Sequence, residues 1–137
     1  MMISTKGRYA LRVMLDLAGQ PKEEYISLKA ISDRQEISMK YLEAIVANLS
    51  KAGLLDSLRG KSGGYRLNKS TAQYSVGAIV RAVESNLSPV SCLEESKGGC
   101  DRAGECLTLP MWQKLDRIVG EYLDSVTLED LLTQNFE

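Results

Sequence analysis

The chain has 137 residues, of which 44% are hydrophobic and 26% are charged, a balance typical of a folded domain rather than a disordered chain. It contains no histidine, which excludes Ser–His and Cys–His nucleophile pairs and histidine-bound metals. No nucleotide-binding glycine motif is present either, so the sequence argues against an enzyme. We expect a cytoplasmic protein without membrane contact, because the chain has neither a long apolar run nor a signal-peptide pattern.

The net charge of −1 hides a division along the chain. Residues 1–81 hold thirteen Lys/Arg and seven Asp/Glu, a net charge of +6, whereas residues 82–137 hold four and eleven, a net charge of −7. A basic first part joined to an acidic second part indicates that the first part contacts a polyanion. Chance segregation of solvated charges is the alternative.

The first half of the chain has the pattern of a helix-turn-helix. Residues 4–18 carry an apolar stripe at helical spacing. Ser27 is a candidate N-cap for a short helix that ends near Gln35, and Ser38 is a second candidate N-cap, for a longer amphipathic helix through Leu49. A short helix, a tight turn and a longer amphipathic helix in this order predict a helix-turn-helix.

A β-hairpin is predicted directly after these helices. Residues 54–59 and 65–68 have strand composition, and the glycine-rich residues 60–64 form the turn between them. Ser75 is the N-cap of a further helix over residues 76–84. The expected fold is therefore mainly α, a winged helix-turn-helix with a small hairpin as the wing.

A long helix is predicted from Pro110, a residue that suits the first turn of a helix. Thr127 and Asp130 have the spacing of a capping box before a short terminal helix. We favour a role in dimerisation for the long helix from Pro110, and packing of this helix on its own domain is the alternative. The expected regions are 1–84 for DNA binding, 85–109 for a cysteine-containing loop and 110–137 for the dimerisation and terminal helices. Apolar residues recur along the long helix at Trp112, Leu115, Ile118, Val119, Tyr122, Leu123 and Val126.

The second helix of the helix-turn-helix and the wing supply the candidate DNA-binding residues. Glu43 can accept a hydrogen bond from a cytosine amine, Arg59 suits a narrow minor groove, and Lys61 suits a phosphate. A protein-interaction module with the same helices is the alternative. The candidates are Ser38, Lys40, Tyr41, Glu43, Arg59, Gly60 and Lys61.

All three cysteines, Cys92, Cys100 and Cys106, lie in one segment with intervals of seven and five residues. Thiolates are soft ligands that suit Fe–S clusters and zinc, although these intervals are long for a zinc knuckle. A thiol switch and incidental thiols remain open.

These motifs together resemble the IscR-type iron–sulfur cluster regulators. Their winged-helix family also contains the cysteine-metabolism repressor, which lacks the three cysteines, and the nitric-oxide-sensing repressor. The resemblance covers nearly the whole chain. It rests on residues 4–10, Ile37-Ser38, Tyr41-Leu42-Glu43, Leu58-Arg59-Gly60, Gly63-Gly64-Tyr65, the three cysteines, Cys106-Leu107-Thr108, Trp112 and Thr127-Leu128.

The resemblance implies a homodimeric transcription regulator that binds a double-stranded DNA operator with two half-sites. It also implies one Fe–S cluster per subunit, usually 2Fe–2S, held by the three cysteines and controlling the choice of operator. In the family, a glutamate at the position of Glu43 discriminates between operator classes, and an arginine at the position of Arg59 enters the minor groove. A zinc- or thiol-switch regulator, or a protein-interaction module without a cluster, is the alternative.

One position departs from the resemblance. The family carries a histidine ligand three residues after the last cysteine, where this chain has Leu109. The fourth ligand is then a nearby carboxylate, another oxygen or an exogenous thiol, and we expect a more labile cluster. The candidate carboxylates are Glu94, Glu95, Asp101 and Glu105.

Overall fold

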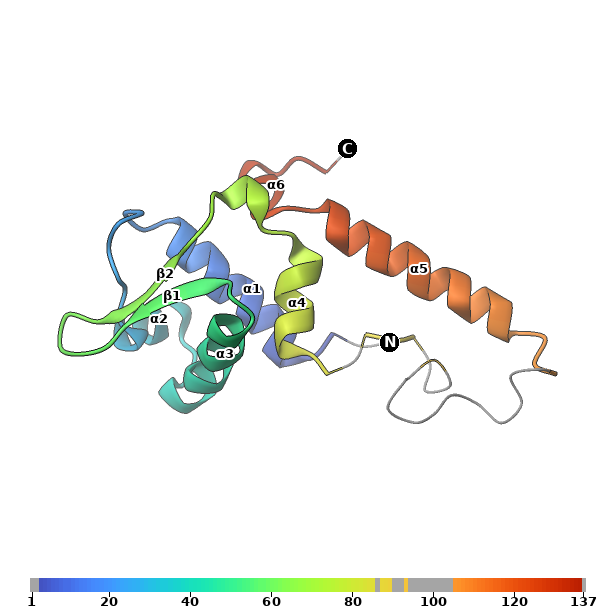
Figure 1. The fold of residues 1–137 in the computed structure, drawn as a ribbon, viewed down its shortest axis with the longest axis horizontal. Helices are drawn as coiled ribbons and strands as arrows, with labels where there is room; N and C mark the ends of the chain where they lie inside the picture. The colour runs from blue at the N-terminus through green and yellow to red at the C-terminus, as the bar shows by residue number, and fades with distance from the viewer. Residues whose placement is uncertain (1–2, 86, 90–92, 94–104, 137) are drawn as a thin grey trace.

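The computed structural model describes residues 3–85, 87–89, 93 and 105–136 (Figure 1). Within these residues the chain is mostly helical and carries a two-stranded antiparallel sheet. In chain order the elements are α1 (Thr5–Ala18), α2 (Leu28–Gln35), α3 (Met39–Lys51), β1 (Leu55–Leu58), β2 (Gly64–Leu67), the 3-10 helix η1 (Thr71–Gln73), α4 (Val76–Val83), α5 (Leu109–Ser125) and α6 (Leu128–Thr133).

The predicted helix-turn-helix is confirmed as α2 and α3. The Ser27 hydroxyl accepts a hydrogen bond from the Ala30 N–H at 3.1 Å, and the Ser38 hydroxyl accepts one from the Tyr41 N–H at 3.2 Å. Both serines therefore satisfy free N–H groups at helix starts. Glu36 ends α2 in the left-handed conformation, with φ of 54°. This residue makes the sharp turn that a glycine more often provides.

The wing is an antiparallel hairpin in which Asp56 pairs with Arg66 and Leu58 pairs with Gly64. A third segment, absent from the sequence prediction, joins it: the Ile26 N–H donates to the Tyr65 carbonyl at 2.8 Å, and the Tyr65 N–H donates to the Ile26 carbonyl at 2.9 Å. The connector between α1 and α2 is therefore attached to the wing.

The start of α1 is capped from the far end of the winged-helix domain. Ser4 is its N-cap residue, but the Ser4 side chain makes no capping bond. Instead Glu84, just after α4, accepts from the Ser4 N–H at 2.8 Å and from the Gly7 N–H at 3.1 Å. A carboxylate at a helix N-terminus satisfies free N–H groups and favours the helix dipole. A Cβ on Gly7 would lie 2.5 Å from the Glu84 oxygen, so a larger residue here would displace the Glu84 carboxylate from its present position.

The hydrophobic core lies among α1, α3 and α4, and α6 contributes to it through the fully buried Leu128. The main chain of α6 is attached to the start of α4: the Val76 N–H donates to the Val126 carbonyl at 2.8 Å, and the Leu128 N–H donates to the Tyr74 carbonyl at 3.0 Å. The predicted capping box is present, since Thr127 and Asp130 exchange hydrogen bonds of 3.0 Å. The terminal helix therefore packs on the winged-helix domain.

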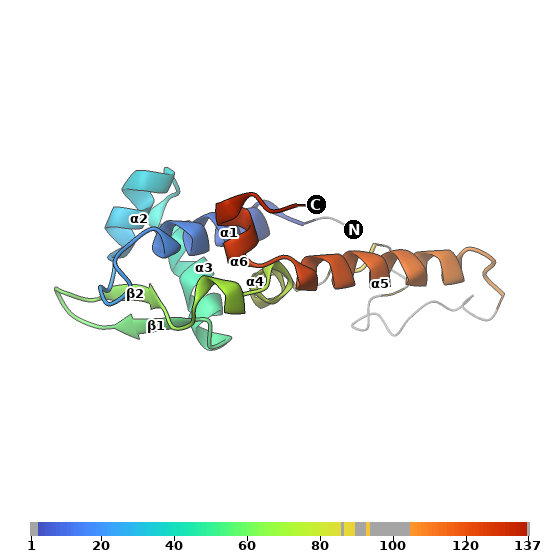
Figure 2. The same cartoon turned by 90° about the horizontal axis from the view of Figure 1, so that it is seen from above.

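Helix α5 extends away from the rest of the molecule as a long arm, which both views show (Figures 1 and 2). It begins at Leu109, one residue before the predicted start, with Pro110 in its first turn. Its attachment to α4 includes an ion pair between Arg81 and Asp124. A Cβ on Gly77 would lie 2.0 Å from the Asp124 carboxylate, so the two helices approach closely at this point. Among the helices that the structure describes, none is long and apolar enough to cross a membrane.

Candidate DNA interface and cysteine segment

The predicted contact residues of α3 share its solvent-exposed side. Lys40 and Glu43 are exposed, and neither has an ion pair with another described residue. The Ser38 hydroxyl is partly used, because it caps α3. A helix that presents a cation and a carboxylate without internal partners can offer both to base edges in a major groove.

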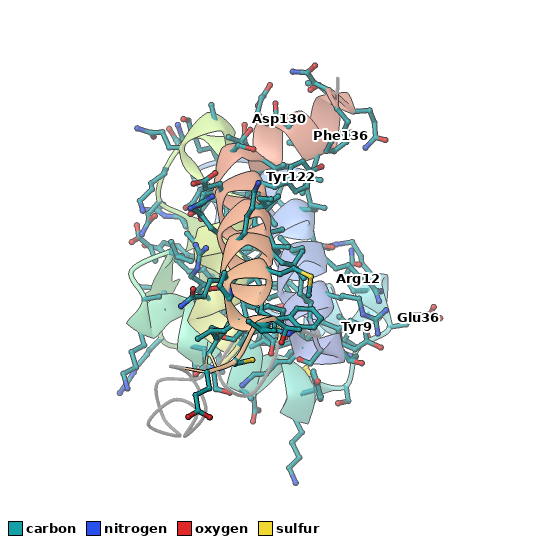
Figure 3. All side chains as sticks on the ribbon, turned by 90° about the vertical axis from the view of Figure 1, so that its right-hand side faces the viewer. Tyr9, Arg12, Glu36, Tyr122, Asp130 and Phe136 are labelled. Carbon is teal, nitrogen blue, oxygen red and sulfur yellow. The ribbon has the colours of Figure 1, made fainter. Side chains whose placement is uncertain are left out.

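Tyr41 is held from α1 rather than free on the surface. Its ring meets the Tyr9 ring edge to face, with the centroids 5.6 Å apart. The Arg12 guanidinium lies over the Tyr9 ring, 5.0 Å from its centroid. The Nε of Arg12 also donates to the Gln35 side chain at 3.2 Å. Figure 3 shows Tyr9 and Arg12 together on α1. The position of Tyr41 therefore depends on α1 and α2, which spacing along the chain could not predict.

The other predicted contacts, Arg59, Gly60 and Lys61, are exposed at the turn of the wing. Gly60 has φ of +107°, a conformation that favours glycine, and its carbonyl accepts from the Gly63 N–H at 3.1 Å. The turn is thus built around glycines, so the two cationic side chains project from a narrow hairpin end. That shape suits entry into a minor groove.

A hollow of about 580 Å³ separates α3 from the wing. Among the described residues that line it, the charged ones are Lys29, Arg59 and Lys61, and all three are cations. Sequence reasoning missed Lys29, although its place just after the N-cap Ser27 was a usable signal. A cationic hollow beside an exposed helix face is suited to a phosphate backbone.

An ion pair between the partly exposed Arg34 and the buried Asp16 fixes α2 against α1. Arg34 donates two hydrogen bonds to the Asp16 carboxylate, at 2.9 and 2.7 Å, and the Gln35 amide donates a third at 2.9 Å. The Asp16 side chain is only 3% exposed. Burial raises the pKa of Asp16, but the hydrogen bonds and charge of its partners outweigh burial, so the pKa lies below its ordinary value of 3.8.

This carboxylate gives a pH-dependent expectation. A lowered pKa in the folded state means that Asp16 stabilises the protein above its ordinary pKa of 3.8 and stops doing so as the pH falls through the folded value. We expect Asp16→Asn to lower the free energy of unfolding by about 2 kcal/mol near pH 6, because a partly exposed arginine loses its charged partner. Urea unfolding of both proteins between pH 6 and pH 3 measures this. A difference that stays constant down to pH 3 would contradict the assignment.

Cys106 lies at the start of α5 in an environment that favours a thiolate. Its sulfur is 3.2 Å from the Thr108 hydroxyl, which makes no capping bond of its own to the helix. Hydrogen bonds from the Thr108 hydroxyl and from the N–H groups of Thr108 and Leu109 lower the pKa of the Cys106 thiol. Metal ligation and nucleophilic chemistry both require this ionised form.

Of the other predicted ligands, the structure describes Glu105, which is exposed beside Cys106. Cys92, Cys100, Glu94, Glu95 and Asp101 lie outside the described residues.

An apolar stripe on α5 faces solvent. Met111, Leu115, Ile118 and Tyr122 are 54%, 39%, 50% and 58% exposed, and they follow one another at steps of three and four residues. Figure 3 labels Tyr122 of this stripe and Phe136 near the C-terminus, and both residues line one hollow. Such a contiguous apolar stripe on a monomer is typical of an interaction surface.

The helix-turn-helix and its wing define the winged-helix fold. Comparison with known proteins gives the family. The sequence pattern of Rrf2, described as an iron-dependent transcriptional regulator, matches residues 3–134. The chain therefore belongs to the Rrf2 family of transcriptional regulators, a non-enzymatic class, which confirms the family resemblance and the expected fold.

Three relatives illustrate the similarity. The chain is 38% identical over 135 residues to the transcriptional regulator IscR of Vibrio parahaemolyticus, which covers 98% of this chain and 79% of that protein. The structure of CymR, the global cysteine regulator of B. subtilis, superimposes with a TM-score of 0.76 at 39% identity, covering 99% of each chain. The structure of IscR from T. potens has a TM-score of 0.72 at 37% identity, covering 99% of this chain and 89% of that one.

Proposed function

We propose that the protein is a cytoplasmic, homodimeric regulator that binds a double-stranded DNA operator with two half-sites and whose operator choice or affinity is controlled by an Fe–S cluster. The observation that carries the DNA-binding part is the hollow between α3 and the wing, whose charged lining residues Lys29, Arg59 and Lys61 are all cations. Helix α3 contributes Met39, Ala47 and Ser50 to the walls of this hollow. Helix α3 then lies in a major groove and the wing reaches the adjacent minor groove.

Each contact residue has a role that follows from its chemistry. Lys40 and the Tyr41 hydroxyl bind phosphates or base acceptors, and Glu43 accepts from a cytosine amine while repelling acceptor edges. Ser38 orients α3 as its N-cap. Arg59 enters the minor groove, and Gly60 allows the close approach of the turn.

The dimer is formed by the exposed stripe of α5. Two copies of this helix side by side remove Met111, Leu115, Ile118 and Tyr122 from water, which offsets the entropy lost on association. A dimer with two-fold symmetry presents two α3 helices, and these match the two half-sites of an operator.

The cluster, in our proposal a 2Fe–2S cluster, is held by Cys92, Cys100 and Cys106. The lowered pKa of Cys106 fits a thiolate ligand. The fourth ligand comes from outside the cysteines, and Glu105 is a candidate that the structure describes. When bound, such a cluster supplies a centre whose oxidation or loss changes the charge and the shape of this segment.

The role of Glu43 is tested by the base preference of a variant. We expect Glu43→Ala to keep its affinity for the preferred operator within about threefold while accepting additional bases at one position of each half-site, because a repulsive carboxylate is removed. Selection from a random duplex library by wild type and variant measures this. Identical preferences would remove Glu43 from the role of discriminator.

Lys29→Gln is the matched control, since it changes the hollow but not the base-facing side of α3. It is expected to weaken binding to all duplexes alike and to reduce the slope of log affinity against log salt by about one for each phosphate that the variant no longer neutralises. A change of base preference in this variant would contradict the separation of the two roles.

The cluster is tested on protein purified without oxygen, by iron, acid-labile sulfide, zinc and visible absorption. We expect iron and sulfide in equal amounts in wild type and their loss in Cys106→Ala, because one of three thiolate ligands is removed. Thr108→Val is the control: it keeps the ligand, removes the hydroxyl beside the sulfur and is expected to retain iron. Zinc alone, or no metal after reconstitution, would replace the cluster with a zinc site or a thiol switch.

A further inference from the structure

A second hollow, of about 250 Å³, lies at the base of the wing, away from α3. The connector that follows α1 passes β2 here (Figures 1 and 2). The hollow shares no lining residue with the one between α3 and the wing. It is lined by Leu17, Ala18, Gln20, Pro21, Lys22, Glu24, Arg66, Leu67, Lys69, Ser70 and Thr71.

The walls of this hollow combine an apolar part with cations. Leu17, Ala18, Pro21 and Leu67 supply hydrocarbon surface from α1, the connector and β2. The charged lining residues are three cations, Lys22, Arg66 and Lys69, and one carboxylate, Glu24, which leaves a net charge of +2. A small concave site with apolar walls and a few convergent charged groups is the usual form of a small-molecule site.

The cations differ in how firmly they are held. The guanidinium of Arg66 lies over Tyr25, 4.2 Å from the ring centroid, and its Nη1 donates to the Glu23 carbonyl at 2.9 Å. Its Nε also pairs with the Asp56 carboxylate at 3.9 Å, so part of its charge is already neutralised. Lys69 lies 5.6 Å from the Tyr74 ring centroid. No ion pair joins Lys22 to another described residue. Arg66 is thus pre-positioned, whereas the ammonium of Lys22 is available to an anion.

We propose that this hollow binds a small organic carboxylate with a short apolar body. The apolar part of the ligand packs on Leu17, Pro21 and Leu67, and its carboxylate pairs with Lys22 and Lys69 beside the fixed Arg66. The volume suits a molecule the size of benzoate, with about nine non-hydrogen atoms, for which a Kd of about 1 mM is the expectation. The ligand would touch the connector and β2 together, the two segments joined by the bonds between Ile26 and Tyr65.

The proposal is tested by titrating the full-length protein with sodium benzoate and following the methyl and amide NMR signals. We expect saturable shifts of Leu17, Ala18 and Leu67, with benzyl alcohol and inorganic phosphate each binding at least tenfold more weakly. Equal affinity for benzyl alcohol would reduce the site to an apolar surface. Equal affinity for phosphate would reduce it to a cationic surface, and either result overturns the proposal, as does the absence of shifts at 20 mM benzoate, about twenty times the expected Kd.

A double variant, Lys22→Gln with Lys69→Gln, isolates the recognition of the carboxylate. It leaves Arg66 and its contacts with Tyr25 and Glu23 in place, and is expected to weaken benzoate binding at least tenfold in a protein that remains folded. The Lys69 contact with the Tyr74 ring is lost, so a small decrease in the unfolding temperature is expected. Lys61→Gln, at the tip of the wing, is the matched control and is expected to bind benzoate as wild type does. Unchanged benzoate affinity in the double variant would overturn the proposal.

Discussion

Ile118→Asp is expected to convert the proposed dimer to a monomer and to weaken operator binding about a hundredfold. Ile118 is 50% exposed in the middle of the apolar stripe of α5, with Leu115 and Tyr122 on either side of it. An aspartate at this place would put a charge into each half of the interface and a like charge opposite it. Loss of the dimer removes the gain of linking two half-sites, which is about a hundredfold or more.

Sedimentation equilibrium measures the first effect, and fluorescence anisotropy on a duplex with two half-sites measures the second. Gln113→Asp is the matched control, because it adds the same charge to an exposed position of the same helix outside the stripe. We expect this control to remain dimeric and to bind the operator as wild type does. A dimeric Ile118→Asp protein with normal operator affinity would show that another surface pairs the subunits.

Gly64→Ala is expected to disrupt the wing. A Cβ at this position would lie 2.1 Å from the carbonyl oxygen of Ile26 and 2.4 Å from its carbon, both main-chain atoms that cannot rotate away. The backbone φ of +155° adds strain for any side chain. The variant must therefore separate the connector from β2, breaking the two hydrogen bonds between Ile26 and Tyr65. We expect a loss of about 3 kcal/mol of stability.

In the proposed function Arg59 and Lys61 of the wing contact DNA, so displacement of the wing is expected to weaken DNA binding even where the helices remain folded. We expect at least a tenfold loss of operator affinity in protein whose circular dichroism shows intact helices. Gly19→Ala is the control: its φ is −83°, and the nearest atom to an added Cβ is 3.5 Å away, an ordinary contact. A Gly64→Ala protein as stable as the Gly19→Ala protein would contradict the close approach of β2 to the connector at Ile26.

Local signals along the chain were sufficient to predict the helices and the hairpin. Ser27, Ser38 and Ser75 each accept a hydrogen bond from the N–H three residues later, as expected of N-cap residues. The capping box at Thr127 depends on a partner only three residues away and is equally local. Such interactions are determined within one turn of helix, so the sequence specifies them directly.

Contacts between distant residues were not predictable in the same way. Glu84 caps α1 from eighty residues away, and the pairing of Ile26 with Tyr65 adds a segment to the wing that strand composition did not indicate. The pairing of Asp16 with Arg34 depends on the angle between two helices. The three cysteines stood out by residue type, but of these three the structure describes only Cys106.

The two attachments at the ends of α4 give the chain a modular organisation. Glu84 ties the end of α4 to the start of α1, and the Val76–Val126 bond returns the chain to the start of α4 after α5. The two ends of the segment 85–125 are thus separated by only the length of α4, about 12 Å. Lengthening such a segment costs little in loop entropy, so segments of different length can be inserted here while the winged-helix core stays unchanged.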